Sequence, residues 1–255
     1  NIAPQHPLES QYFKQHYFRY LQTLKRVANL LPGSTVVDLG TIPGHLSAAC
    51  KMLGAKRVIG LDYNPNRSGF KQKLEAKGIE IIEHNLEHGG IPIPSGSADL
   101  ILFTEVIEHL SANAGAVLLE CRRILKPNGL LLITTPNVNN LANQIRKIFG
   151  KSVLPNAKEM GPKPEQQHQY EYSSQELCML LKNSGFSVNS REYFAGTERA
   201  ILTGDFKSAL PQTLAKIYER NLSPFPEFLQ TPQTPENNSH TWFLYVVRLK
   251  NASYR

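Results

Sequence analysis

The sequence predicts an α/β fold in which a mostly parallel sheet is covered by helices on both faces. Three observations lead to this prediction. Short apolar runs alternate with helical patterns across residues 35–135, which is typical of parallel strands joined by crossover helices. The run at 130–135 is apolar enough to be buried on both of its faces. A glycine-containing turn follows the first strand, and an acidic residue, Asp62, ends the second.

The composition is that of an ordinary globular protein. The chain has 255 residues, of which 41% are hydrophobic, and this is enough for one large domain with additions. No apolar run approaches the ~20 residues that a bilayer requires, so we expect no membrane span. The three cysteines lie far apart in the sequence, which is typical of a reducing cytosol, and we therefore expect a cytoplasmic protein. The net charge of +7 is typical of a solvated basic surface, and no RNA-recognition motif accompanies it.

The first half of the chain contains four predicted strands and the helices between them. Apolar residues at spacings of three and four predict an N-terminal helix over residues 8–31, which Pro32 and Gly33 end. The predicted strands and helices then alternate: strands at 35–39, 57–62, 79–83 and 99–103, and helices at 44–53 and 65–77.

The second half continues this alternation and then becomes less regular. We predict a helix at 112–125, a turn at 126–129, a strand at 130–135, a helix at 138–149, an exposed loop or lid at 151–167, and a helix at 173–184. Two last strands, 186–194 and 242–249, are predicted to form an antiparallel pair at the sheet edge. The insertion 204–240 between them is expected to be partly helical near 210–219.

These elements suggest a division of the chain. Residues 1–33 form a helical cover, and residues 34–137 form the core. Residues 138–172 form a lid or substrate segment. Residues 173–255 complete the same domain and contain the insertion.

The turn after the first strand carries the most informative motif. A dinucleotide-binding fingerprint that starts at Gly40 requires glycines at 42 and 45, and the chain has Ile42 and His45. A looser pattern, in which an acid is followed by three alternating glycines, is matched at three of its four places, by Asp38, Gly40 and Gly44, and not at position 42. Such a turn brings the backbone and a helix N-terminus close to a nucleoside, and the acid that ends the next strand can bind its ribose.

This stretch resembles motif I of the class I S-adenosylmethionine (SAM) methyltransferases. The resemblance implies a Rossmann-like three-layer sandwich with seven strands, and SAM as the cofactor. It also implies that Asp62 is the ribose-binding acid. Ile42 replaces the middle glycine of the family motif, and Pro43 further restricts this loop.

Two later stretches resemble the same family. Glu-Val-Ile-Glu-His-Leu at 105–110 and Leu-Leu-Ile-Thr-Thr-Pro-Asn at 131–137 are similar to small-molecule methyltransferases, including the ubiquinone O-methyltransferases. Asn85 stands where the family usually has an adenine-binding Asp, and its amide oxygen can still accept a hydrogen bond. The resemblance as a whole implies that the cofactor is bound by Asp38, Gly40, Thr41, Gly44, Asp62, Tyr63, Asn85, Leu86 and Thr104.

A group of acids and histidines indicates a second site. If a helix begins at Glu105, then Glu105, Glu108 and His109 share one of its faces. Together with His168 they also resemble the small-RNA 3′-terminal 2′-O-methyltransferases, in which two Glu and two His hold a divalent metal. This donor set suits Mn²⁺, Fe²⁺, Co²⁺ or Zn²⁺ better than Mg²⁺. The segment 164–167 before His168 is uncharged apart from Glu165, so it is a poor match for binding RNA phosphates.

The leading hypothesis is O-methylation of a small-molecule hydroxyl. His109 is the first candidate for the general base and His168 the second, while Glu105 orients a neighbouring group. The N-terminal helix, with Tyr12, Tyr17 and Arg19, is expected to cover the substrate pocket together with the insertion. One alternative is a metal-dependent RNA 3′-end ribose methyltransferase. Another is a non-catalytic binding protein in which Ile42 and Asn85 mark a lost cofactor site.

Overall fold

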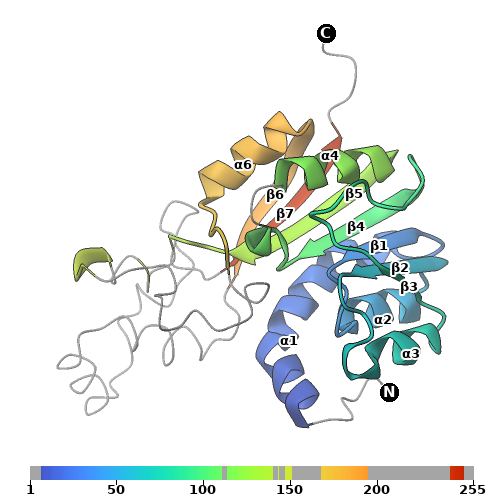
Figure 1. Cartoon of the computed structure of the whole chain (residues 1–255). Coiled ribbons are helices and arrows are strands. Elements are labelled where there is room, and N and C mark those ends of the chain that lie inside the picture. Colours follow the sequence, from blue (N-terminus) through green and yellow to red (C-terminus); the bar gives the residue numbers. More distant parts are fainter. Residues whose placement is uncertain are drawn as a thin grey trace.

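A seven-stranded sheet organises the chain (Figure 1). The computed structural model describes residues 7–110, 114–139, 143, 147–150, 168–194 and 242–249. The strand order is β3-β2-β1-β4-β5-β7-β6, and only β7 runs antiparallel to its neighbours. The strands are β1 Thr35–Leu39, β2 Arg57–Asp62, β3 Glu80–Glu83, β4 Ala98–Thr104, β5 Leu125–Pro136, β6 Phe186–Phe194 and β7 Trp242–Leu249. The predicted sheet and its antiparallel edge pair are confirmed.

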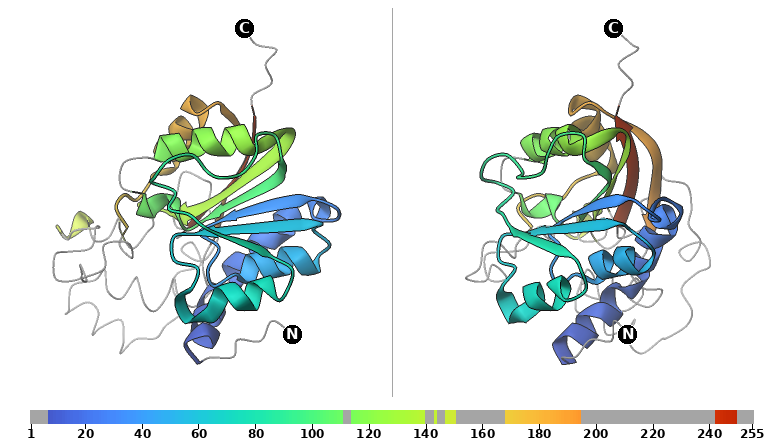
Figure 2. Two further views of the ribbon diagram at one scale, coloured as in Figure 1. Left: turned by 45° about the vertical axis from the view of Figure 1, so that its right-hand side comes forward. Right: turned by 90° about the vertical axis from the view of Figure 1, so that its right-hand side faces the viewer.

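Helices cover both faces of this sheet, so the fold has three layers. The helices α1, α2 and α3 lie on one face, and α4 and α6 lie on the other (Figure 1, Figure 2). Their bounds, with those of the short 3₁₀ helices, are α1 Pro7–Val27, η1 Ala28–Leu30, α2 His45–Met52, η2 Arg67–Gly69, α3 Phe70–Glu75, η3 Ile107–His109, α4 Ala114–Ile124 and α6 Ser174–Asn183.

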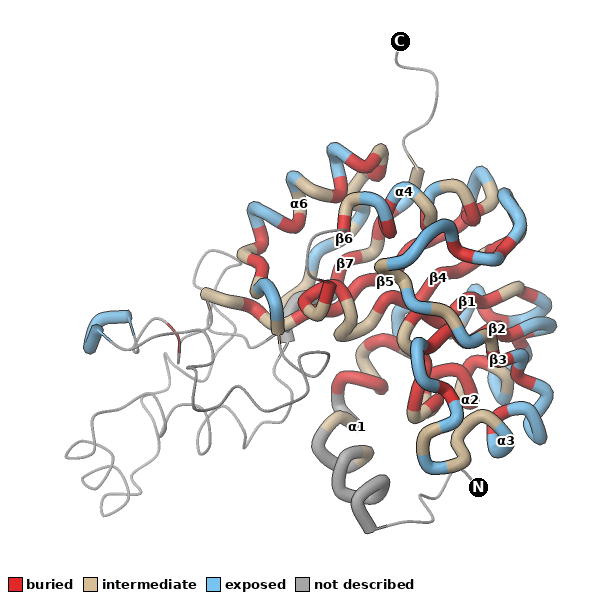
Figure 3. Tube along the Cα trace, in the orientation of Figure 1, coloured by how far each residue is buried: buried red, intermediate tan, exposed pale blue. Residues whose placement is uncertain are grey.

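Each face of the sheet has its own hydrophobic core. Successive side chains of a strand point to opposite faces, and β4 shows this directly. Ile101 and Phe103 pack in the core under α4 and α6, whereas Leu100 and Leu102 pack in the core under α1, α2 and α3. Figure 3 shows buried residues running along the central strands. Burial on both sides explains why these strands are continuous apolar runs, and why polar side chains appear where the strands end.

Two predicted element boundaries were wrong. β5 begins at Leu125, which already pairs with Ala98, so the predicted turn at 126–129 is an irregularity within this strand. No α-helix begins at Glu105, which has a φ of 56° and lies before the short η3. Glu105 therefore does not share a helical face with Glu108 and His109.

The helix α6 begins where its sequence predicts. The Ser173 hydroxyl accepts a hydrogen bond from the backbone N–H of Glu176, and the Glu176 carboxylate accepts one from the backbone N–H of Ser173. This reciprocal capping box satisfies two donors that the first helical turn leaves open. The cap also fixes the path of the chain that leads from the site into α6.

Several predictions concern residues outside the described ranges. These are the loop or lid at 151–167, the insertion 204–240 with its helix near 210–219, half of the helix at 138–149, and the side chains of Tyr12 and Tyr17. Among the described helices, none has the length and apolar character that crossing a bilayer requires.

Candidate functional site

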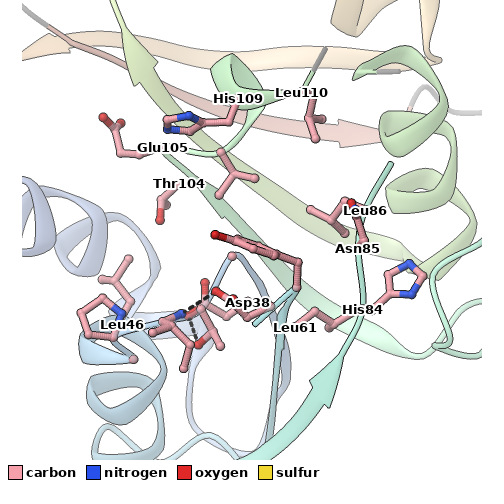
Figure 4. A pocket seen from close by; sticks show the side chains of 18 of the residues that line it. Asp38, Leu46, Leu61, His84, Asn85, Leu86, Thr104, Glu105, His109 and Leu110 are labelled. Carbon is pink, nitrogen blue, oxygen red and sulfur yellow. Dashed lines mark hydrogen bonds between the residues drawn. The ribbon is translucent and has the colours of Figure 1, made fainter. Parts of the chain in front are cut away.

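A cavity of about 770 Å³ opens where β1, β2 and β4 end. Ligands of open α/β sheets bind outside the carboxyl ends of the strands, and this volume is typical of a small-molecule pocket. Figure 4 shows Asp38, Leu46 and Leu61 on one side of the cavity, His84, Asn85 and Leu86 on a second, and Glu105, His109 and Leu110 on a third. Three segments that are distant in the sequence therefore form one pocket.

The loop between β1 and α2 forms one wall of the cavity. Gly40 and Gly44 have positive φ angles of 72° and 88°, which glycine adopts without strain. A Cβ on Gly40 would lie 2.3 Å from Val106 Cγ2, and a Cβ on Gly44 would lie 2.4 Å from Leu74 Cδ2. Both glycines are thus required by conformation and by space.

The Asp38 carboxylate holds this loop in place through hydrogen bonds. Its Oδ2 accepts hydrogen bonds from the Ser47 hydroxyl at 2.6 Å and from the Thr41 hydroxyl at 3.0 Å. Burial raises the pKa of Asp38 to about 6, although the two hydrogen bonds oppose this rise; the nearby Asp62 adds to it. The carboxyl group holds α2 and the glycine loop in one fixed arrangement.

Asp62, at the end of β2, lies against this loop at the cavity. One carboxylate oxygen accepts a hydrogen bond from the backbone N–H of Asn64 at 2.9 Å, and the other accepts one from the backbone N–H of Ile42 at 3.3 Å. Arg67 lies 3.5 Å from the second oxygen. Asp62 lines the cavity together with Gly40, Thr41 and Gly44, so these four predicted residues come together.

The Ile42 side chain does not fill the cavity. Its side chain is buried in the core cluster that contains Tyr20, Leu46 and Leu74, on the helical side of the loop. Its backbone N–H still reaches Asp62. The residue that replaces a family glycine thus contributes to the hydrophobic core, and the cavity persists beside it.

The segment after β3 supplies another wall of the cavity. Asn85 and Leu86 line it, and the Asn85 side-chain oxygen accepts a hydrogen bond from the backbone N–H of Glu87 at 3.0 Å. This oxygen therefore already has one partner within the turn. Tyr63 is 42% exposed, and the Arg67 guanidinium lies 5.8 Å from its ring centroid.

Glu105 lies where β4 ends, and it connects the sheet to α1. Its carboxylate pairs with Arg19 at 3.1 Å and accepts a hydrogen bond from Thr134 at 2.8 Å. Both members of the ion pair are largely buried and both line the cavity. The pair closes the side of the cavity that faces α1, and Thr104 lies beside it.

Glu108, His109 and His168 form a cluster next to the cavity. One ligand atom from each lies within 4.8 Å of the other two, and the two imidazole rings have centroids 5.0 Å apart. Burial raises the pKa of Glu108 well above its usual range, and the neighbouring Glu105 adds to this rise. Glu105 does not belong to the cluster, so three of the four residues that the sequence grouped are adjacent.

Several site residues were not singled out from the sequence. Arg67 and His84 line the cavity, and Gln169 reaches it from the chain that precedes α6. Glu171, which binds His168, was also missed. The position of His84 directly before Asn85 could have indicated it. Gln169 directly follows His168, and the grouping of His168 with Glu108 and His109 could have indicated its place beside η3.

Comparison with known proteins identifies relatives. A family model described as "Methyltransferase domain" matches residues 12–191. A probable S-adenosylmethionine-dependent methyltransferase of Mycolicibacterium smegmatis is 30% identical over 180 residues, covering 71% of this chain and 61% of that protein. A ubiquinone biosynthesis O-methyltransferase of Bradyrhizobium diazoefficiens is 34% identical over 143 residues, covering 54% of this chain and 55% of that protein. The chain thus spans less than two thirds of the length of these relatives.

Solved structures share the fold. The complex of the Haloferax volcanii Trm112 methyltransferase activator with a methyltransferase matches with a TM-score of 0.63 and 17% identity, over all of both chains. A SAM-dependent methyltransferase of Mesorhizobium loti matches with a TM-score of 0.57 and 15% identity, covering 89% of this chain and 96% of that one. At such identities these matches support the architecture alone.

Proposed function

This chain belongs to the class I SAM-dependent methyltransferases, and on that premise we propose that it transfers a methyl group from SAM to a small-molecule hydroxyl. One observation carries the cofactor part of this proposal. The Gly40–Gly44 loop and the Asp62 carboxylate line a single cavity of about 770 Å³ at the carboxyl ends of the strands. A glycine loop and an acid in this relation suit a nucleoside with a polar tail.

The residues around the cavity divide into plausible contacts for the parts of SAM. Asp62 would accept hydrogen bonds from the ribose hydroxyls. Leu86 and Tyr63 would pack on the adenine, and the Asn85 amide would bind its edge. The loop backbone would lie along the methionine part, and Arg19 would face its carboxylate while Glu105 faces its amino group. Thr104, next to Glu105 in the sequence, also lines the cavity.

SAM, when bound, supplies an electrophilic methyl group whose bond to sulfur breaks as the bond to the acceptor oxygen forms. The protein then has two tasks, which are to align the acceptor and to remove its proton. His109 lines the cavity, so its imidazole is the first candidate to accept the hydroxyl proton. His168, whose ring lies 5.0 Å from that of His109, is the second candidate.

The choice of acceptor follows from resemblance and from the shape of the site. Relatives named ubiquinone biosynthesis O-methyltransferase support an oxygen acceptor. The described part of the cavity wall near His109 includes Leu110, Val106 and Gln169, which together offer an apolar surface with one amide. Such a surface suits a small organic hydroxyl better than a chain of phosphates.

Calorimetry with S-adenosylhomocysteine tests the cofactor site. Asp62→Asn removes the acid proposed to bind the ribose, and we expect its affinity to fall by about tenfold or more, because hydrogen bonds to charged groups contribute about 1.5–3 kcal/mol. Asp99→Asn is the matched control, because Asp99 lies near the opposite end of β4 and pairs with Lys126 there. No heat of binding with the unaltered protein would support a non-catalytic binding protein.

Transfer of labelled methyl from SAM tests the acceptor. The substrates are a panel of phenols and alcohols and, separately, single-stranded RNA with a 3′-terminal ribose. Label in small molecules that falls strongly in His109→Ala supports the proposal. Label found only in RNA, together with salt-dependent RNA binding, would replace it with the RNA 3′-end alternative.

A further inference from the structure

The helix α1 reaches two walls of the cavity through consecutive residues. Arg19 pairs with Glu105 at 3.1 Å, where β4 ends. Tyr20, the next residue, lies against the glycine loop, and its ring centroid is 5.6 Å from that of His45. Successive side chains of an α-helix point about 100° apart, which allows one helix to contact both walls. These two contacts therefore link the glycine loop to the end of β4.

The surface of the loop that α1 contacts is aromatic and apolar. The imidazole of His45, the first residue of α2, has its centroid 4.9 Å from the ring of Phe13, which also belongs to α1. Ile42 is buried and packs in the same core cluster as Tyr20. The apolar surface that this packing removes from water stabilises the contact between α1 and the loop. A glycine at position 42, as in the family motif, would offer no side chain to this contact.

Tyr20 connects this apolar contact to Arg19. Both side chains are buried, and the Arg19 guanidinium carbon lies 5.6 Å from the Tyr20 ring centroid, within the range of a cation–π interaction. Closely packed side chains do not shift singly, because each fills the space that its neighbours leave. Removing the Ile42 side chain would open a space into which Tyr20 can move, and Arg19 would move with it.

We propose that Ile42 is a positioning residue, which acts through Tyr20 to hold Arg19 at the cavity. This inference rests on the proposed function, in which Arg19 faces the carboxylate of the methionine part of SAM. A guanidinium and a carboxylate bind strongly only at hydrogen-bond distance, so a displaced Arg19 would lose this contact. Loss of the Ile42 side chain should therefore weaken binding of the amino-acid tail and leave the contacts to the nucleoside in place.

Two ligands separate the tail from the nucleoside. S-adenosylhomocysteine carries the amino-acid tail, whereas 5′-methylthioadenosine has the same nucleoside and sulfur without the amino and carboxylate groups. Calorimetry of the full chain measures both. We expect Ile42→Ala to weaken S-adenosylhomocysteine about tenfold and 5′-methylthioadenosine by less than about twofold, because only the tail uses a charge-assisted hydrogen bond. Ile42→Val keeps most of the apolar contact and should bind both ligands as the unaltered protein does.

Ile42→Gly gives a test of sign. It restores the middle glycine of the family motif, so the motif alone predicts tighter binding of S-adenosylhomocysteine. The positioning role predicts weaker binding, because the contact with α1 is lost. A gain in affinity would overturn the proposal.

Arg19→Met removes the group through which Ile42 is proposed to act. Residues that act through one another give non-additive losses, so Ile42→Ala added to Arg19→Met should cause little further loss of S-adenosylhomocysteine affinity. Ile81→Ala is the matched control, because Ile81 is also 8% exposed and belongs to the same core cluster but lies on β3. It should leave the affinity unchanged with and without Arg19→Met.

The possible results are distinct. Equal losses of both ligands in Ile42→Ala would show a distorted loop and overturn the positioning role, and so would losses that add to those of Arg19→Met. Circular dichroism identifies a variant that does not fold. Tyr20→Leu, which removes the ring beside Arg19 but stays apolar, should give the same selective loss and keeps the test decisive. These results leave the proposed function standing if the unaltered protein binds S-adenosylhomocysteine, whereas absence of that binding would overturn both.

Discussion

Gly40 offers the most direct test of how the glycine loop is built. Its φ of 72° lies in the left-handed region, and a Cβ placed on it would lie 2.3 Å from Val106 Cγ2. Gly33 is a matched control, because its φ of 76° is similar but no atom lies within 4 Å of its added Cβ. The two alanine variants therefore share the conformational cost and differ in the collision.

The expected magnitudes follow from these two terms. The left-handed conformation costs an alanine about 1–2 kcal/mol, and this cost lowers the free energy of unfolding of both variants. Forcing one extra carbon into a filled space costs about 1–3 kcal/mol more, and this cost applies only to Gly40→Ala. Gly33→Ala should lower the free energy of unfolding by about 1–2 kcal/mol, and Gly40→Ala by about 2–5 kcal/mol. For a chain of this size, each kcal/mol corresponds to about 2–4 °C in Tm.

Val106→Ala supplies the rescue. It removes the Cγ2 that collides, at a cost of about 1 kcal/mol for truncating a half-buried side chain. In the double variant the collision is absent, so a double-mutant cycle of urea unfolding should give a favourable coupling of about 1–2 kcal/mol. S-adenosylhomocysteine affinity should fall in Gly40→Ala and recover in part in the double variant, because the same loop lines the cavity.

Two results would refute this reasoning. Equal destabilisation in Gly33→Ala and Gly40→Ala would mean that the collision is relieved without cost. A coupling near zero with Val106→Ala would mean that Val106 is not the group that excludes a side chain at position 40.

Three further predictions concern charge and capping. Burial raises the pKa of Asp38 to about 6, so its contribution to stability is full below pH ~4 and is lost as pH rises through 6. In urea unfolding, the free energy of unfolding of Asp38→Asn relative to that of the unaltered protein should therefore rise by up to about 3 kcal/mol between pH 4 and 7. A difference that stays constant over this pH range would contradict the prediction. Arg19→Met should cost about 3 kcal/mol because the buried Glu105 carboxylate loses the cation that it pairs with, and added Glu105→Gln should restore part of this loss in thermal unfolding. Ser173→Ala should cost about 1 kcal/mol and change hydrogen exchange mainly in the first turn of α6; uniform exchange changes would exclude a local cap effect.

Much of the fold was predictable from local pattern. The strands β1 and β2 match their predicted bounds, because β-branched runs between a proline-glycine stop and a glycine turn leave few alternatives. Helix α6 matches the predicted helix at 173–184, and the side chains of Ser173 and Glu176 form its cap. The boundaries that failed, at 126–129 and at Glu105, are places where pairing with a neighbouring strand or packing overrides a local turn or helix signal.

The candidate site was predictable in part. Asp38, Gly40, Gly44 and Asp62 were identified because they occupy fixed positions at strand ends, and the structure places them around one cavity. The grouping of Glu105 with Glu108 and His109 failed because it assumed helical geometry that the positive φ of Glu105 prevents. Arg67 was missed because it follows neither a strand end nor a motif, and Gln169 was missed although it directly follows His168.

The sequence by itself determined the order of strands and helices, the glycine turn and the acid at the end of β2, because these depend on periodicity and on residues only a few positions apart. Only the tertiary structure decided that Ile42 packs into the core, that Arg19 binds Glu105, and that Glu105 lies apart from Glu108, His109 and His168. These contacts join segments tens of residues apart, and their geometry depends on how the layers pack, which no local pattern encodes.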